Sequence, residues 1–351
     1  MQYQQSMARM MGGLKKEVED GAQQVEQVQQ AQVVMDADAT TTSQLSQYKE
    51  VVQDMDMPQF AEFLRTHGDY ILRIVLPVIW TILLVVFLDR ESFIRTIYMP
   101  FIGVFAATLA NCIPLGGGIV YVPLLSLLGA EIHLSVAFTV ATMTIGNGCF
   151  GFLQWLLKDP TLIVWESFVF TVLPCSLGSA FGILLVPPLD SFWVKKIFGA
   201  FCLLVAAYVA LLAHAHGSEE RSGPTTRPAP SRHQWVVVVI VFFLSGVVLV
   251  TNIGIGPALI AYFMLGDNYL GYSQKQAIVT GIITGGWVSA VPFFLHTVVL
   301  GDVPVKLWIM VLPGVYAGAL LAPRVYEAVG LKIIFSAFSV FLVLSAVMFL
   351  W

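Results

Sequence analysis

Long, continuous apolar runs dominate this chain after a polar first part. A helix of about 20 apolar residues crosses the hydrocarbon core of a bilayer, because it rises about 1.5 Å per residue. Continuous runs also argue against membrane β-strands, in which apolar and polar residues alternate. We therefore predict uninterrupted membrane spans near 71–88, 136–157, 163–186, 192–213, 275–300, 304–322 and 331–351.

Two further apolar stretches, at about 97–128 and 235–265, are too long for one straight crossing. A helix of about 30 residues would measure about 45 Å, whereas the hydrocarbon core is about 30 Å thick. Each stretch contains a polar, glycine-rich interruption, from Asn111 to Gly118 and from Thr251 to Pro257. Glycine clusters break helices. We expect each stretch to form a re-entrant hairpin, and two arms that both cross are the alternative.

The second half of the chain repeats the first at a distance of about 140 residues. The matches, in order, are Ala137-Phe138-Thr139 with Ala277-Ile278-Val279, Leu173-Pro174 with Leu312-Pro313, and 194–201 with 331–338. Several matches in order indicate an internal duplication. Each repeat then has an odd number of crossings, whether or not the hairpin arms cross. The expected fold is an all-α polytopic membrane protein of two inverted repeats, with one extra N-terminal span.

This interpretation divides the chain into five parts. They are a polar N-terminal region (1–65), helical or disordered; the extra span with its loop (66–96); repeat 1 (97–213); a linker rich in Pro, Gly, Ser and Arg (214–234); and repeat 2 (235–351). Within the first part, apolar residues near a heptad seam at 14–35 are a candidate surface for weak self-association. A solvated tail is the alternative.

Composition supports the membrane class, since 57% of the residues are hydrophobic and only 11% are charged. A soluble domain carries about 25% charged residues. The net charge of −4 does not favour a nucleic-acid partner, so the lipid bilayer is the expected environment. Lys and Arg are more frequent on the side that carries Arg65 and Arg73, which we place in the cytoplasm with the N-terminus. The sequence leaves open which membrane holds the chain.

The two interruptions contain the first candidate site residues. A helix that restarts after a break presents free N–H groups and a positive dipole end, which suit an anion. Glycines allow a tight turn there, proline suits the first turn of the next helix, and asparagine amides can cap the break or donate to a ligand. Close helix packing is the structural alternative for the glycines. The candidates are Asn111, Gly116, Gly117, Gly118, Asn252, Gly254, Gly256 and Pro257.

Hydroxyl groups follow on the span after each broken stretch. Thr139 and Thr142 lie in one half, and Thr280 and Thr284 in the other. Their position favours a role in the transport pathway, although threonine in an apolar helix often bonds its own backbone. His296 is the clearest intramembrane titratable group and is a proton-coupling candidate. Its nearness to Asp302 at the span end makes an interfacial histidine the alternative.

Other kinds of chemistry have no support in the sequence. No buried carboxylate is available to ligate a cation. The four cysteines lack metal-binding spacing, so buried free thiols and no metal site are expected. There is no Walker lysine and no nucleotide-binding fingerprint. We expect no enzyme activity and no cofactor.

The runs GGGIVYVPLLSLLG and SVAFTVAT, and then GIGPALIAYFMLG and QAIVTG, resemble the two halves of the TauE/SafE-type sulfite exporter family. The resemblance covers about 97–213 and 235–351. Its motif positions here are Gly116, Gly117, Gly118, Pro123, Gly254, Gly256 and Pro257. It implies a secondary transporter that exports a small sulfur-containing anion, sulfite or an organosulfonate, and we expect alternating access. An anion channel, and a membrane anchor or assembly protein acting through the N-terminal region, are the alternatives.

Overall fold

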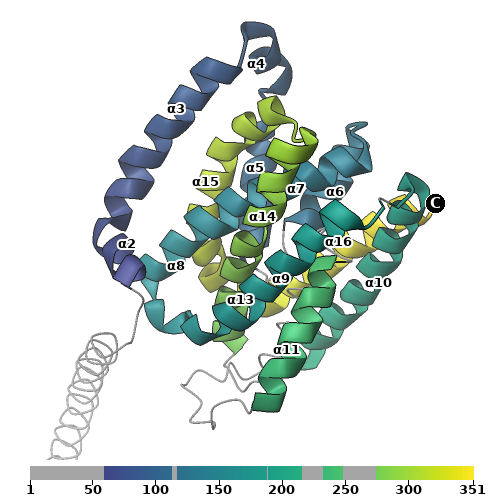
Figure 1. Cartoon of the computed structure of the whole chain (residues 1–351). Helices are drawn as coiled ribbons and strands as arrows, with labels where there is room; N and C mark the ends of the chain where they lie inside the picture. The colour runs from purple at the N-terminus through teal and green to yellow at the C-terminus, as the bar shows by residue number, and fades with distance from the viewer. Residues whose placement is uncertain (1–58, 113–116, 188, 216–231, 248–273) are drawn as a thin grey trace, which may run out of the picture. The chain divides into compact units, whose positions relative to one another are not determined.

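The computed structural model of the 351-residue chain describes residues 59–112, 117–187, 189–215, 232–247 and 274–351. These residues form helices, and no strand occurs among them. Within them, six helices are long and apolar enough to cross a membrane, or seven if the bent pair Arg90–Thr96 and Met99–Cys112 counts as one span. The expected all-α polytopic class is confirmed (Figure 1).

The helices have the following bounds. They are α2 (Gln59–Tyr70), η1 (Ile71–Val75), α3 (Leu76–Phe87), α4 (Arg90–Thr96), α5 (Met99–Cys112), α6 (Gly118–Leu127), α7 (Ile132–Ile145), η2 (Gly146–Gly151), α8 (Phe152–Lys158), η3 (Pro160–Leu162), α9 (Trp165–Leu185), α10 (Ser191–Ala215), α11 (Arg232–Ser245), α13 (Gln274–Val288), α14 (Ala290–Phe294), η6 (Leu295–Leu300), α15 (Val305–Val329) and α16 (Leu331–Leu350). Of these, η1, η2 and η6 are π-helical, and η3 is a 3-10 turn.

The helices coincide with the expected spans, with two differences in length: α15 ends at Val329 rather than near 322, and the first span begins earlier than expected. The span expected at 71–88 lies within a longer helical segment, Gln59–Phe87, of 29 residues. The first turns of that segment are amphipathic rather than apolar, which is why hydropathy alone places its start too late.

The first long apolar stretch is broken. Helix α5 has 14 residues and α6 has 10, so each is shorter than the roughly 20 residues needed to cross a bilayer. In the second stretch, α11 also has 14 residues, and residues 248–273 lie outside the described part. Whether either stretch turns back to the side it entered stays a prediction.

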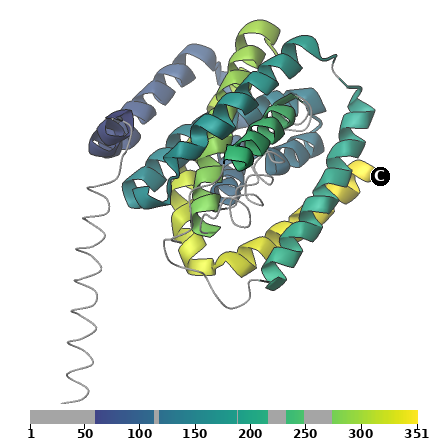
Figure 2. The ribbon, with the colours of Figure 1, turned by 60° about the horizontal axis from the view of Figure 1, so that its bottom comes forward.

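Each half of the chain packs a helix against a helix of the other half. Helix α5, in the first half of the chain, packs along α15 in the second half, and α11, in the second half, packs along α9 in the first (Figure 1). Helices α10 and α16 pack on one another (Figure 2). Missing side chains allow these close approaches: a Cβ on Gly314 would lie 1.8 Å from the Pro100 carbonyl oxygen, and one on Gly178 would lie 2.1 Å from that of Phe243. Small residues at helix contacts are typical of membrane proteins.

Two spans form the centre of the molecule. The segments Ile132–Lys158 and Lys275–Leu300 bury 83% and 72% of their most apolar windows. They cross where Gly148 faces Gly286, and a Cβ on Gly286 would lie 2.0 Å from the backbone nitrogen of Gly148. The indole nitrogen of Trp287 donates to the Gly148 carbonyl oxygen at 3.0 Å. The helix crossing therefore depends on backbone-to-backbone contact.

The extra N-terminal span lies against this core at a few points. The ring of Phe60 packs on Trp165 and Trp287, with centroids 6.1 and 6.3 Å apart. Further along, the Trp80 indole nitrogen donates to the Ile309 carbonyl oxygen at 2.9 Å. After the span, Lys306 pairs with Asp89 at 2.6 Å. Only 6% of the most apolar part of this span is fully buried, and the other residues there are half-buried or exposed.

Candidate functional site

The amide of Asn111 lies at the end of α5, next to the first break. Its nitrogen Nδ2 donates to the Ala107 carbonyl oxygen at 2.9 Å. This bond fixes the amide orientation, because a flipped amide would set two acceptor oxygens against each other. The oxygen Oδ1 faces η2, where a Cβ on Gly151 would lie 2.2 Å from it. The Asn111 side chain therefore contacts both α5 and η2, and its amide N–H donor already has a partner within the protein.

The start of α6 presents a weakly engaged donor. The backbone N–H of Gly117 donates to the Met143 sulfur at 3.1 Å, and a thioether is a weak acceptor. Gly117 has φ −61°, so it is needed for close packing and not for a left-handed turn. A Cβ there would lie 3.1 Å from the Tyr121 ring and 3.3 Å from Met143 Cγ. A stronger acceptor in front of α6 can therefore replace the sulfur.

The four candidate threonines divide into two kinds. The hydroxyl of Thr139 donates to the Ser135 carbonyl oxygen at 2.7 Å. The hydroxyl of Thr280 donates to the Leu162 carbonyl oxygen at 3.1 Å and accepts from the Val164 N–H at 3.0 Å. Both hydroxyls thus have structural partners.

Thr142 and Thr284 are as deeply buried as Thr139 and Thr280, but their hydroxyls have no hydrogen-bond partner among the described residues. Buried polar atoms are normally satisfied, so an unpaired one calls for a water, an ion or a ligand. The two unpaired hydroxyls lie on α7 and α13, within the two central spans. Of the four candidate threonines, Thr142 and Thr284 are therefore the two whose hydroxyls can bind a ligand without losing a hydrogen bond within the described residues.

Tyr121 and Asn147 are further polar residues of this region that the sequence analysis did not single out. The Tyr121 side chain is 1% exposed, and its hydroxyl has no partner in the described part of the chain. The buried amide nitrogen of Asn147 reaches the Ala110 carbonyl oxygen at 3.4 Å and joins η2 to α5. Tyr121 stands in the first glycine-rich motif, and Asn147 stands between two glycines in a long span. The glycine-rich motif around Tyr121 and the glycines beside Asn147 are the sequence features that could have identified these two residues.

His296 combines burial with a position at a span end. Its side chain is 9% exposed, and Nδ1 lies 2.8 and 3.0 Å from the two Asp302 carboxylate oxygens. Gly301 between them has φ 66°, a left-handed conformation that lets the chain turn back. The other ring nitrogen, Nε2, is buried and has no partner among the described residues. The histidine is therefore held in one orientation with a second nitrogen facing the protein.

The buried polar groups of the described residues are of few kinds. They include amides, hydroxyls and one histidine, and no Lys, Arg, Asp or Glu belongs to them. A ligand in this interior would meet hydroxyls, amide groups and helix ends rather than a buried Lys, Arg, Asp or Glu; the Asn111 oxygen Oδ1 is a buried acceptor without a partner among the described residues. The remaining predicted site residues, Gly116, Asn252, Gly254, Gly256 and Pro257, lie outside the described residues, as does the 14–35 segment.

A model of the family described as Sulfite exporter TauE/SafE matches residues 99–349, most of the chain. The chain belongs to this family of membrane transporters, and it is an integral, multi-pass membrane protein. Comparisons with curated proteins and with solved structures found no match. The matched range begins at Met99, after the extra N-terminal span.

Proposed function

We propose that this member of the TauE/SafE sulfite exporter family is a secondary transporter that exports sulfite or an organosulfonate. The observation that carries the site is the pair of buried, unpaired hydroxyls of Thr142 and Thr284 on the two central spans. Their surroundings hold no buried Lys or Arg within the described part of the chain. Neutral donors and helix N-termini can hold an anion that still has to be released.

In this proposal, the first half of the site is the start of α6, with Gly116, Gly117 and Gly118, together with Thr142. The second half is the corresponding break with Asn252, Gly254, Gly256 and Pro257, together with Thr284. Asn111 positions the first break, because its amide is fixed on Ala107 and against Gly151. Thr139 and Thr280 support the helices and loops around the site through their backbone bonds.

We further propose that repeats 97–213 and 235–351 are inverted and alternate between two open states, with 1–65, 66–96 and 214–234 outside them. The packing of α5 and α11 against helices of the opposite half supports a two-fold relation. The N-terminus lies in the cytoplasm in this arrangement. In this proposal His296 is the proton-coupling residue: Asp302 holds its Nδ1, and its Nε2 is buried without a partner among the described residues.

The test compares two threonines one turn apart on α7. Valine removes a hydroxyl and keeps the side-chain shape. We expect Thr142→Val, and likewise Thr284→Val, to weaken sulfite binding about 10- to 100-fold, because a hydrogen bond to a charged group contributes about 1.5–3 kcal/mol. Thr139→Val is the matched control and should bind like the parent, since its hydroxyl serves Ser135. Binding is measured on purified protein with sulfite.

Two outcomes would change the proposal. Equal sulfite affinity of the parent, Thr142→Val and Thr284→Val would remove these hydroxyls from the site. Sulfite flux in liposomes without counterflow would identify a channel with the same site, because a carrier exchanges substrate across the membrane and a channel does not.

A further inference from the structure

Tyr121 is a fully buried tyrosine whose hydroxyl has no role in the described fold. The ring packs edge-to-face on Phe138, with centroids 5.4 Å apart. The hydroxyl oxygen has no partner among the described residues. A buried tyrosine hydroxyl usually finds a hydrogen-bond partner, and an unpaired one destabilises the protein. Phenylalanine would fill the same space without that loss of stability. The hydroxyl is therefore expected to bind a ligand that is present only part of the time.

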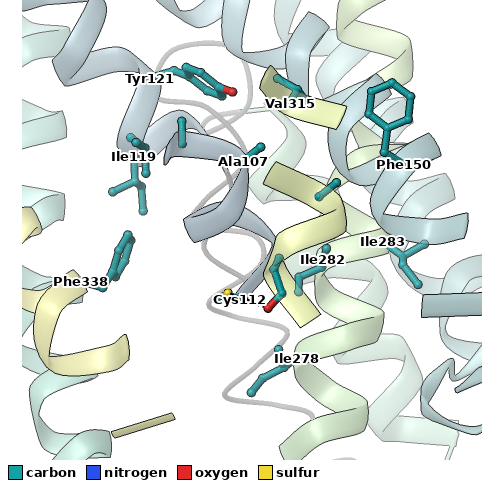
Figure 3. Close-up of a cluster of buried hydrophobic side chains, with 14 of the residues drawn as sticks. Ala107, Cys112, Ile119, Tyr121, Phe150, Ile278, Ile282, Ile283, Val315 and Phe338 are labelled. Carbon is teal, nitrogen blue, oxygen red and sulfur yellow. Dashed lines mark hydrogen bonds between the residues drawn. The ribbon is translucent and has the colours of Figure 1, made fainter. Parts of the chain in front are cut away.

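The direction of the ring shows where that partner binds. Tyr121 stands four residues after Gly117, and long side chains on a helix fold back toward its N-terminus. The ring atoms Cδ2 and Cε2 lie 3.1 Å from the place of a Cβ on Gly117. One edge of the ring therefore faces the N-terminal end of α6, and Figure 3 shows the hydroxyl pointing away from the ribbon that carries Tyr121. The first N–H groups of a helix have no intrahelical partner there.

Thr142 offers a third donor on α7, the helix that packs against the Tyr121 ring. Phe138, which supports the Tyr121 ring, and Thr142 are four residues apart on α7, so they share a face of that helix. The next residue, Met143, accepts the Gly117 N–H. The Gly117 N–H and the hydroxyls of Tyr121 and Thr142 thus come from two packed helices, and none has a strong acceptor in the described structure. Several donors without acceptors complement a ligand rich in acceptors, such as an oxyanion.

We infer that Tyr121 is a substrate-binding residue whose hydroxyl donates to an oxygen of the bound sulfur oxyanion at the start of α6. The inference rests on the proposed function and deepens it. It adds a second hydroxyl to the half of the site formed by repeat 1. It also explains why this apolar helix contains a tyrosine at a position with no solvent contact.

The test is Tyr121→Phe in the full chain, with sulfite as the probe. The sulfite dissociation constant should rise about tenfold or more, because a hydrogen bond to a charged group is lost. The melting temperature without sulfite should stay the same or rise, since no protein hydrogen bond is removed. Tyr121→Met, which fills apolar space without a hydroxyl, should weaken binding similarly. Tyr98→Phe, at an exposed tyrosine between α4 and α5, is the control and should bind like the parent.

The outcomes separate this inference from the function on which it rests. If Tyr121→Phe binds sulfite like the parent while Thr142→Val binds weakly, Tyr121 is not in the site and the function stands. If Tyr121→Phe lowers the melting temperature and leaves the affinity unchanged, the hydroxyl has a structural role and the inference is wrong. If the parent chain itself binds neither sulfite nor a sulfonate, the proposed function fails first.

Discussion

The central spans and the extra N-terminal span differ in how deeply they are buried, and the order is the opposite of what hydropathy alone would predict. The most apolar part of the extra span, Gln59–Phe87, is more hydrophobic than that of either central span, yet only 6% of it is buried. The central spans, Ile132–Lys158 and Lys275–Leu300, are less hydrophobic and are the most buried of the six candidate spans in the described part of the chain. Lipid accepts apolar side chains, whereas polar groups at membrane depth need protein or water around them. In this chain, the less apolar spans therefore mark the interior.

The two regions also use different contacts. The central spans meet backbone to backbone at Gly148 and Gly286 and carry unpaired hydroxyls. The extra span contacts the core through side chains, such as Trp80 on the Ile309 carbonyl oxygen and the buried Ala61 and Leu72. Contacts of the first kind tolerate no added atoms, and contacts of the second kind can adjust. The following predictions test that difference.

The largest effect is expected from Gly286→Ala. Its Cβ would lie 2.0 Å from the backbone nitrogen of Gly148, so the central spans must separate. Overpacking of this kind costs about 3 kcal/mol or more. The matched variant in the extra span is Gly68→Ala, whose Cβ would lie 3.3 Å from a mobile Leu157 methyl group. It should leave thermal stability in detergent nearly unchanged. Equal losses in the two variants would contradict the comparison.

An intermediate effect, on coupling rather than on folding, is expected from His296→Gln. Glutamine keeps a polar side chain and cannot carry the proton. Sulfite transport driven by an imposed pH gradient should be lost, whereas sulfite exchange without a gradient should continue. Asp302→Asn keeps the imidazole but removes its carboxylate partner, so gradient-driven transport should fall less. Full gradient-driven transport by His296→Gln would exclude this histidine as the proton carrier.

The smallest effect is expected from Asp89→Asn, after the extra span. The Lys306 ammonium holds the pKa of the Asp89 carboxyl well below its usual range. A lowered folded-state pKa means that the pair stabilises the fold above the usual pKa of aspartate. This stabilisation disappears as the pH falls through the folded-state pKa.

Because Asp89 and Lys306 are exposed, Asp89→Asn should lower the melting temperature only slightly at neutral pH and low salt. At acidic pH the variant and the parent should melt together. Glu91→Gln, which breaks an ion pair within α4, is the control. It removes one negative charge and leaves the Asp89–Lys306 ion pair intact. A loss of transport in Asp89→Asn would show that the extra span has more than a supporting role.

The sequence by itself determined the class of the protein and the positions of its spans. Hydropathy is a local property, so runs such as 163–186 predict helices such as α9 without knowledge of their neighbours. The break after Asn111 follows from the length of its apolar stretch and its glycines. Burial of Cys112, Cys175 and Cys202 also follows from their places in apolar spans, whereas Cys149, expected to be buried too, is half-buried. The family motifs are short and contiguous, so they too can be read from the chain.

Only the tertiary structure decided which polar groups have partners. Every threonine in a helix has a backbone carbonyl four residues earlier, so the sequence cannot separate Thr139, which uses it, from Thr142, which does not. The partner of Thr280 is Leu162, in the other half of the chain. The unpaired hydroxyl of Tyr121 depends on α6 packing against α7. Hydrogen bonding of buried groups is set by the nearest atoms in space, and those come from segments that are distant in the sequence.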